Sequence, residues 1–314
     1  MNDTANSLFI TGASGFIARN LLAKFDATRY SKVYCLSRTL TNDPESPSLC
    51  GKCHVIRGGI HDPDLYAPYL RSTDTLVHLA AATGKVSRRE FYEVNIDGTQ
   101  LLVDQCKRAG VKKFLYVSSI AARYPDKTRS PYAKSKEMAE NVVRNSGLNY
   151  AIVRPTIVIG HDSAVWKSLL MLAGARIAPI VGDGTTKIQP IHIEDLVDCL
   201  VSIINQTTFT DDVLELGGPE VIGIESFIRK IRELNYGTQL RTVHIPAKPL
   251  MAVLWTLEAF LRPILPVTAG QFSAFLYDGT IEMNAVLQKH MAGMKGIAAM
   301  LESCRETRQG IDGC

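Results

Sequence analysis

Two hydrophobic patterns alternate along the first half of the chain. Short runs of apolar and β-branched residues predict buried strands, and longer segments with apolar residues every three or four positions predict amphipathic helices. The expected strands are 7–11, 32–37, 53–57, 74–79, 114–119 and 150–154, and the expected helices are 16–25, 95–109 and 132–146. This alternation predicts an α/β fold with a doubly wound parallel sheet of the Rossmann type.

The pattern changes after Pro155, where turn-rich stretches alternate with short helices. We expect a nucleotide-binding domain over 1–156 and a smaller C-terminal substrate-binding lobe over 157–314. Parts of that lobe can return to the sheet. Ligands of such folds bind at the carboxyl edge of the sheet, which the lobe would cover.

The composition is that of a globular protein. Of 314 residues, 46% are hydrophobic and 21% charged, which excludes a disordered or fibrous chain. The net charge of +4 is small and dispersed, so we expect no nucleic-acid partner. The polar N-terminal residues do not resemble a signal peptide, and the seven cysteines are an odd number, so we expect reduced thiols and a cytoplasmic location. One isolated pair, Cys50 and Cys53, does not complete a zinc pattern, and we expect no metal.

The most apolar stretch is 250–267. It contains two charged residues and two prolines, and it is shorter than the ~20 apolar residues of a membrane span. Two interpretations stay open: a helix buried in the second lobe, or a helix that docks on a membrane surface or a partner.

A glycine-rich turn follows the first expected strand. Gly12 permits the tight turn, Gly15 lets backbone N–H groups approach a pyrophosphate, and Ala18 lets the helix pack close to the strand. Strand, turn and helix together predict a dinucleotide site. An acidic residue at the end of the second strand would select NAD, but this chain has Ser37 and Arg38, which suit a 2′-phosphate. The sequence therefore favours NADP(H). NAD(H) stays open, in which case Arg38 would be a solvated loop residue.

Acid–base chemistry is indicated by Ser119, Tyr132 and Lys136. Tyr132 and Lys136 are four residues apart and share one face of the expected helix. A neighbouring ammonium favours the phenolate, which can exchange a proton with a hydroxyl or carbonyl beside nicotinamide. Asn95 either hydrogen-bonds within its helix and orients the lysine side or is a solvated polar residue.

With these motifs the chain resembles an extended or atypical short-chain dehydrogenase/reductase of the NAD(P)-dependent epimerase/dehydratase group. The resemblance is carried by TGASGFIA (11–18), HLAAA (78–82), VNIDGT (94–99), YVSSIAA (116–122), SPYAKSK (130–136), VRPT (153–156) and QPIHIEDL (189–196). It implies a catalytic role for Ser119, Tyr132 and Lys136. It also implies a cofactor site formed by Gly12, Ser14, Gly15, Phe16, Ile17, Ile60, Leu79, Ala80, Ala81, Pro155, Thr156 and Ile157, with Ser37, Arg38, Tyr132 and Lys136.

The chain departs from the family pattern at several positions. Gly59 stands where an aspartate commonly contacts adenine, and the segment between Ser119 and Tyr132 is shorter than in sugar epimerases. Sugar-nucleotide enzymes of the family often have an arginine shortly before the position of Ile191, where it binds the diphosphate. This chain has no arginine there, and Lys187 is the nearest cation that could serve. We therefore expect an NAD(P)(H)-dependent oxidoreductase acting on a secondary alcohol or ketone of a sugar-like or other small molecule.

Two alternatives remain open. One is a nucleotide-sugar epimerase or dehydratase with tightly bound NAD(P). The other is a non-catalytic NADP(H)-binding scaffold resembling the complex I accessory subunit. A homodimer through two helices of the nucleotide-binding domain is common in the family, and is one possible assembly for this chain.

Overall fold

The computed structural model describes residues 6–24, 26–39, 53–128, 130–246 and 276–305. The chain divides into two compact units. Unit 1 comprises Met1–Pro155, Val197–Leu216 and Asn284–Val286, and unit 2 comprises Thr156–Leu196, Gly217–Met283 and Leu287–Cys314. The apolar stretch 250–267 lies outside the described residues.

Unit 1 is built on a seven-stranded sheet with the order β11-β6-β5-β4-β1-β2-β3. Its strands are β1 (Asn6–Thr11), β2 (Tyr30–Ser37), β3 (Cys53–Arg57), β4 (Thr75–His78), β5 (Lys113–Val117), β6 (Tyr150–Pro155) and β11 (Val213–Leu216). Every pairing is parallel, as expected for strands connected through helices. The predicted doubly wound parallel sheet is confirmed, and β11 joins it beside β6 from late in the chain.

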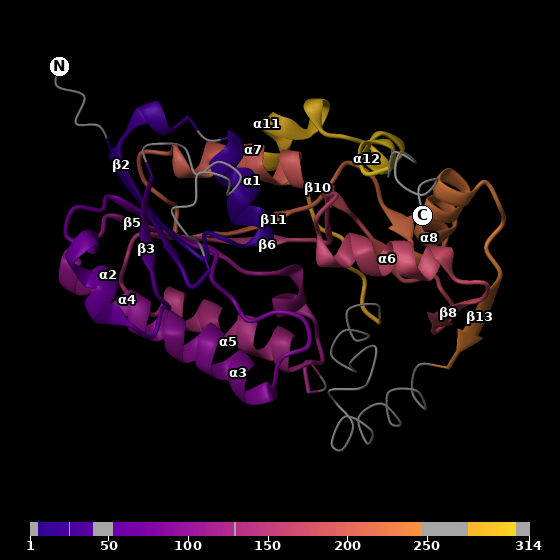
Figure 1. The fold of residues 1–314 in the computed structure, drawn as a ribbon, viewed down its shortest axis with the longest axis horizontal. Coiled ribbons are helices and arrows are strands. Elements are labelled where there is room, and N and C mark those ends of the chain that lie inside the picture. The colour runs from indigo at the N-terminus through magenta and orange to yellow at the C-terminus, as the bar shows by residue number, and fades with distance from the viewer. Residues whose placement is uncertain (1–5, 25, 40–52, 129, 247–275, 306–314) are drawn as a thin grey trace, which may run out of the picture. The chain divides into compact units, whose positions relative to one another are not determined.

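Helices cover both faces of this sheet (Figure 1). One face carries α2 (Pro63–Leu70), α3 (Arg88–Tyr92), α4 (Gly98–Ala109) and α5 (Pro131–Arg144), and the other carries α1 (Phe16–Lys24) and the part of α7 (Ile193–Ile204) that belongs to unit 1. Two short 3₁₀ turns, η1 (Ala27–Arg29) and η3 (Ile120–Arg123), complete the unit. Its core packs residues such as Phe9, Leu76 and Phe114 at zero exposure.

The single helix expected over 95–109 is wrong at its start. The structure has α3, then a π-helical turn η2 (Glu93–Asp97), then α4. Asn95 lies in the π turn and is buried, where its amide bonds both backbone groups of Ala82 and the Ser135 hydroxyl. The solvated interpretation of Asn95 is therefore wrong, and so is a side-chain bond within its own helix. These contacts are made across elements, which periodicity does not report.

Unit 2 has its own apolar core. The short pairs are β7 (Val158–Ile159) with β10 (Ile191–His192), β9 (Lys187–Ile188) with β12 (Ile222–Gly223), and β8 (Ala178–Val181) with β13 (Thr242–Ile245). Its helices are α6 (Ala164–Gly174), α8 (Ile224–Tyr236) and α12 (Ile297–Ser303), with the 3₁₀ turn η4 (Met291–Gly293); α11 (Ala285–His290) starts in unit 1. Helices α6 and α8 pack around the buried side chains of Trp166 and Phe227.

Candidate functional site

The phosphate-binding turn joins β1 to α1. Gly12 has a φ of +66°, and a Cβ there would lie 2.6 Å from the backbone nitrogen of Ala80, so both conformation and space require glycine. The N–H of Gly15 donates to the Gly12 carbonyl at 2.9 Å, and Ala18 is buried against the strand. Phe16 and Ile17 open α1, where a helix leaves N–H groups without intrahelical partners. The turn and the start of the helix together form a cradle that suits an anionic group.

A cluster of hydroxyl groups lies beside this turn, at the carboxyl end of β2. The hydroxyls of Ser37 and Thr39 both donate to Ser14 Oγ, at 2.9 and 3.0 Å. Ser37 is buried, whereas Arg38 and Thr39 are exposed. Hydroxyl donors next to an exposed guanidinium suit an anionic group. The sequence singled out Ser14, Ser37 and Arg38 but missed Thr39.

The segment after β3 is stabilised locally. The Asp62 carboxylate accepts the N–H of Gly59 at 3.0 Å, and the Tyr66 hydroxyl donates to the Ile60 carbonyl at 2.9 Å. The Ile60 side chain is buried and packs so closely on Gly98 that a Cβ there would lie 2.2 Å away. Gly59 also lies beside the Arg38 side chain, so the β2 and β3 ends meet here.

The carboxyl end of β4 is held by two threonines and a histidine. Thr11 Oγ1 accepts the N–H groups of Leu79 and Ala80 at 3.2 Å each. The His78 ring bridges Thr11, at 2.8 Å, and Thr99 of α4, at 2.9 Å. Burial lowers the pKa of His78 to about 3, so this ring stays neutral and serves as a connector. Leu79, Ala80 and the following Ala81 are partly exposed along the same edge of the sheet as Gly12.

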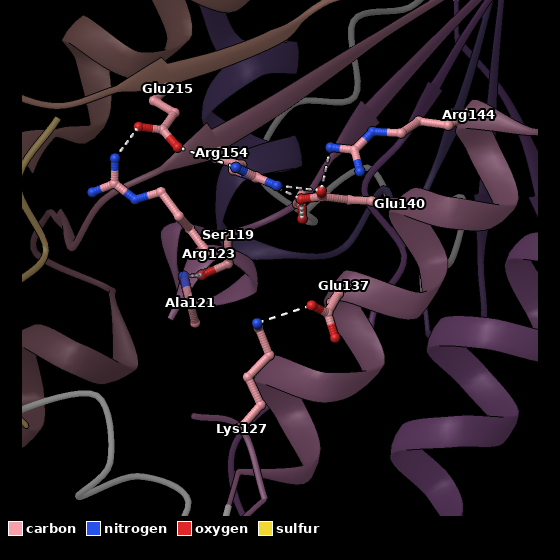
Figure 2. Close-up of polar contacts among 10 residues, drawn as sticks. Ser119, Ala121, Arg123, Lys127, Glu137, Glu140, Arg144, Arg154 and Glu215 are labelled. Carbon is pink, nitrogen blue, oxygen red and sulfur yellow. Dashed lines mark hydrogen bonds and ion pairs between the residues drawn. The ribbon is translucent and has the colours of Figure 1, made fainter. Parts of the chain in front are cut away.

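Ser119 and Tyr132 meet just beyond β5. Ser119 is the N-cap of η3 and accepts the Ala121 N–H at 3.2 Å (Figure 2), and Tyr132 lies in the first turn of α5. Burial raises the pKa of Tyr132, and a side-chain hydrogen bond with Ser119 acts in the opposite direction. The phenol therefore lies beside the Ser119 hydroxyl, the kind of neighbour that acid–base chemistry at this residue would use.

Lys136 lies one turn further along α5 and is almost completely buried. Its Nζ donates to the Val117 carbonyl at 2.8 Å and lies 4.4 Å from the centre of the Tyr116 ring. Burial lowers the pKa of Lys136 to about 7, and the carboxylate of Glu140 acts against that shift. Lys136 and Tyr132 both lie on α5, four residues apart, as the sequence predicted.

A buried carboxylate, Glu140, completes this face of α5. It accepts the Ser118 hydroxyl at 2.6 Å, two bonds from Arg154 at 2.8 and 2.6 Å, and one from Arg144 at 3.1 Å (Figure 2). A buried carboxylate needs such partners, because an unpaired buried charge is costly. The sequence-based prediction missed Glu140, although its spacing could have identified it: Glu140 follows Lys136 by four positions, as Lys136 follows Tyr132.

The last expected cofactor residues fall on either side of the boundary between the units. Pro155 ends β6 in unit 1, whereas Thr156 and Ile157 belong to unit 2. The Thr156 hydroxyl donates to the Gln189 carbonyl at 2.6 Å within unit 2. Over the described ranges, no three His, Cys, Asp or Glu residues are grouped to hold a metal ion, and no helix there is long and apolar enough to cross a membrane.

One family model and several known proteins match this chain. The model of the NAD dependent epimerase/dehydratase family matches residues 8–217. The ceramide reductase of Caulobacter vibrioides is 28% identical over 202 residues, which cover 64% of this chain and 61% of that protein. The UDP-glucose 4-epimerase of Vibrio cholerae is 26% identical over 331 residues, which cover 97% of this chain and 95% of that protein.

Solved structures share the fold. The structure of gox2253 superposes with a TM-score of 0.71 at 21% identity, covering 96% of this chain and 97% of that one. That of TunA, an NAD dependent NDP-hexosamine 5,6-dehydratase, has a TM-score of 0.68 at 19% identity, with 95% and 96% covered. At such identities the likeness concerns the fold. The match to the ceramide reductase spans less than two thirds of that protein's length.

Proposed function

Because the chain belongs to the NAD-dependent epimerase/dehydratase family, we propose that it is an NAD(P)(H)-dependent oxidoreductase acting on a secondary alcohol or ketone of a small molecule. The observation that carries this proposal is the group formed by Tyr132 in the first turn of α5, Ser119 beside it and Lys136 one helical turn further on. It lies at the carboxyl end of β5. In a parallel sheet that end shares an edge with the phosphate-binding turn after β1.

The cofactor is a nicotinamide dinucleotide, which when bound supplies or accepts the hydride. The glycine-only cradle at Gly12 and the start of α1 fit its pyrophosphate. The strand end at Leu79–Ala81 would border its ribose, and Pro155, Thr156 and Ile157 its nicotinamide. Arg38 and the Ser14 hydroxyl, which accepts from Ser37 and Thr39 and keeps its own proton out of those bonds, favour NADP(H) because they supply donors and no carboxylate.

In this proposal the three polar side chains near β5 have separate roles. During reduction Tyr132 donates its phenolic proton to the carbonyl oxygen, and during oxidation the phenolate accepts the hydroxyl proton. Ser119 orients that oxygen, and its hydrogen bond stabilises the phenolate. Lys136, whose Nζ binds the Val117 carbonyl, would supply positive charge to this group and hold the cofactor ribose.

The substrate class can be narrowed by comparison. The ceramide reductase resemblance favours reduction of a ketone on a lipid-like molecule, and the absence of a diphosphate-gripping arginine before Ile191 agrees with this. A nucleotide-sugar epimerase or dehydratase is the second candidate, because the Vibrio cholerae epimerase matches nearly end to end. The same residues would serve it, with the hydride returned to the substrate.

One experiment separates the two candidates. The purified protein is denatured and any released nicotinamide dinucleotide is identified, and the intact protein is then assayed with NADPH against an oxidised ceramide, a 3-ketosteroid and UDP-glucose. Consumption of NADPH with a ketone, by a protein purified without nucleotide, supports the reductase. Stoichiometric bound nucleotide with interconversion of UDP-glucose supports the epimerase.

Tyr132→Phe provides the matched control for this assay. It removes one hydroxyl and is expected to lower turnover by about 10²–10⁴-fold while leaving nucleotide affinity nearly unchanged. Full turnover by this variant would contradict the assignment of Tyr132. Failure of the wild-type protein to bind either nucleotide would contradict the cofactor proposal, whereas nucleotide binding without turnover of any ketone or UDP-glucose would favour the non-catalytic NADP(H)-binding scaffold.

A further inference from the structure

Polar contacts hold the chain on both sides of Ser119. Before it, the Ser118 hydroxyl donates to Glu140 at 2.6 Å. After it, Arg123, the last residue of η3, donates to Glu215 at 2.7 Å (Figure 2). Ser119 is the N-cap of that short turn. A carboxylate therefore holds the residue before Ser119, and another holds the residue that ends the turn after it.

One arginine connects the two carboxylates. Arg154 donates through Nε and Nη2 to Glu140, at 2.8 and 2.6 Å, and through Nη1 to Glu215, at 3.2 Å. Arg154 and Glu215 are also direct partners in the register of β6 and β11, so the sheet fixes their backbones. Only 14% of the Arg154 side chain and 1% of the Glu140 side chain are exposed, so solvent and salt screen this pair weakly.

The same carboxylate lies on the helix that carries the acid–base groups. Tyr132, Lys136 and Glu140 follow one another at intervals of four residues along α5, and therefore share one face of the helix. A bond from Ser118 to Glu140 thus fixes the end of β5 against this face. The bidentate contact from Arg154 fixes the direction of the Glu140 carboxylate, which a single bond would leave free to rotate.

We propose that Arg154 is a positioning residue which, by bridging Glu140 and Glu215, holds Ser119 in place beside Tyr132. The chemical importance of that placement rests on the proposed function. The bridge itself is a property of the folded chain and can be tested without substrate or nucleotide.

The test uses full-length protein with tyrosine labelled at Cζ, observed by carbon NMR at neutral pH without nucleotide. The Tyr132 signal is identified by its loss in Tyr132→Phe, and Ser119→Ala shows its position without the neighbouring hydroxyl. The double variant Ser118→Ala/Arg123→Gln releases both flanks of Ser119, and its Tyr132 signal is expected to move most of the way to the Ser119→Ala position. Arg154→Lys keeps the charge but cannot bridge two carboxylates, and is expected to move the signal part of the way.

Two variants separate positioning from a general loss of charge. Arg123→Lys keeps a cation for Glu215 and is expected to retain the wild-type signal. Arg144→Gln removes a guanidinium from the same Glu140 but lies at the far end of α5, and is also expected to retain it. An unchanged Tyr132 signal in the double variant, or an equal movement in Arg144→Gln, would overturn the proposal.

Folding and activity are followed in parallel. Unfolding midpoints show whether each variant folds, and if Arg154→Lys does not, the exposed Arg123→Gln change carries the test together with Ser118→Ala. With a ketone substrate, the double variant is expected to lower kcat by on the order of tenfold to hundredfold with an unchanged KM for the nucleotide. Absence of wild-type hydride transfer would contradict the proposed function alone, since the Tyr132 signal reports the bridge separately.

Discussion

The two ends of the proposed nucleotide-binding edge of unit 1 are built in different ways. Around Tyr132, the charged groups Lys136 and Glu140 are almost completely buried and bonded to backbone, hydroxyl and guanidinium groups. Around Ser14, the hydroxyls lie at a partly exposed corner beside Arg38, which is exposed. The first arrangement fixes one geometry for chemistry, because buried charges tolerate few alternatives. The second can change its ligand preference at little cost to the fold.

The largest effect that this contrast predicts is on folding stability. Arg154→Met removes a guanidinium from the buried carboxylate of Glu140, and is expected to lower the free energy of unfolding by about 3–5 kcal/mol. Urea unfolding followed by circular dichroism measures this change. The control is Arg144→Met. The Arg144 guanidinium binds the same carboxylate from an exposed position, so its loss is expected to lower the free energy of unfolding by only about 0–1 kcal/mol. Equal losses in the two variants would remove the distinction between buried and exposed partners.

A second effect separates backbone conformation from close contact. Gly12 and Gly110 both have positive φ, +66° and +74°, but only at Gly12 would a Cβ meet neighbouring backbone. Gly110→Ala is expected to cost about 1–2 kcal/mol of stability through conformation alone. Gly12→Ala is expected to cost more and also to abolish nucleotide binding. Thermal unfolding and nucleotide titration of both variants check this, and unimpaired binding by Gly12→Ala would contradict the cradle.

The sequence predicted features formed by residues close together in the chain and missed contacts between residues far apart in it. The parallel sheet, the glycine turn and the Tyr132–Lys136 spacing are local patterns, and the sheet is confirmed by the structure. The bridge from Glu140 through Arg154 to Glu215 joins residues 14 and 61 positions apart. It depends on β11 returning beside β6, and hydrophobic periodicity does not specify which strand lies next to which. Thr39 was missed for a related reason: its hydroxyl matters only because the β2 end meets the turn at Ser14.

Lys136 predicts a dependence of stability on pH. Its folded-state pKa is lowered by burial to about 7, whereas the unfolded lysine titrates near 10.5. Between these values the unfolded chain binds more protons, so this residue makes stability rise with pH across that window and contributes no slope below it. The difference in unfolding free energy between wild type and Lys136→Met, measured from about pH 7 to pH 10.5, is expected to show this rise. A constant difference would mean that Lys136 stays charged in the folded protein.

The smallest expected effect lies at the exposed corner. Arg38→Ala is expected to weaken NADPH binding on the order of tenfold and to leave NADH binding nearly unchanged, because a charge-assisted contact with a 2′-phosphate is lost. Stability should not change, since Arg38 is exposed. Arg29, also exposed but at the opposite end of β2, supplies the control Arg29→Ala, which removes the same charge from the unit. If both variants weaken NADPH binding equally, the preference for NADPH over NADH arises from overall charge. If neither does, Arg38 is a solvated residue and the hydroxyls of Ser14, Ser37 and Thr39 serve only to hold the turn.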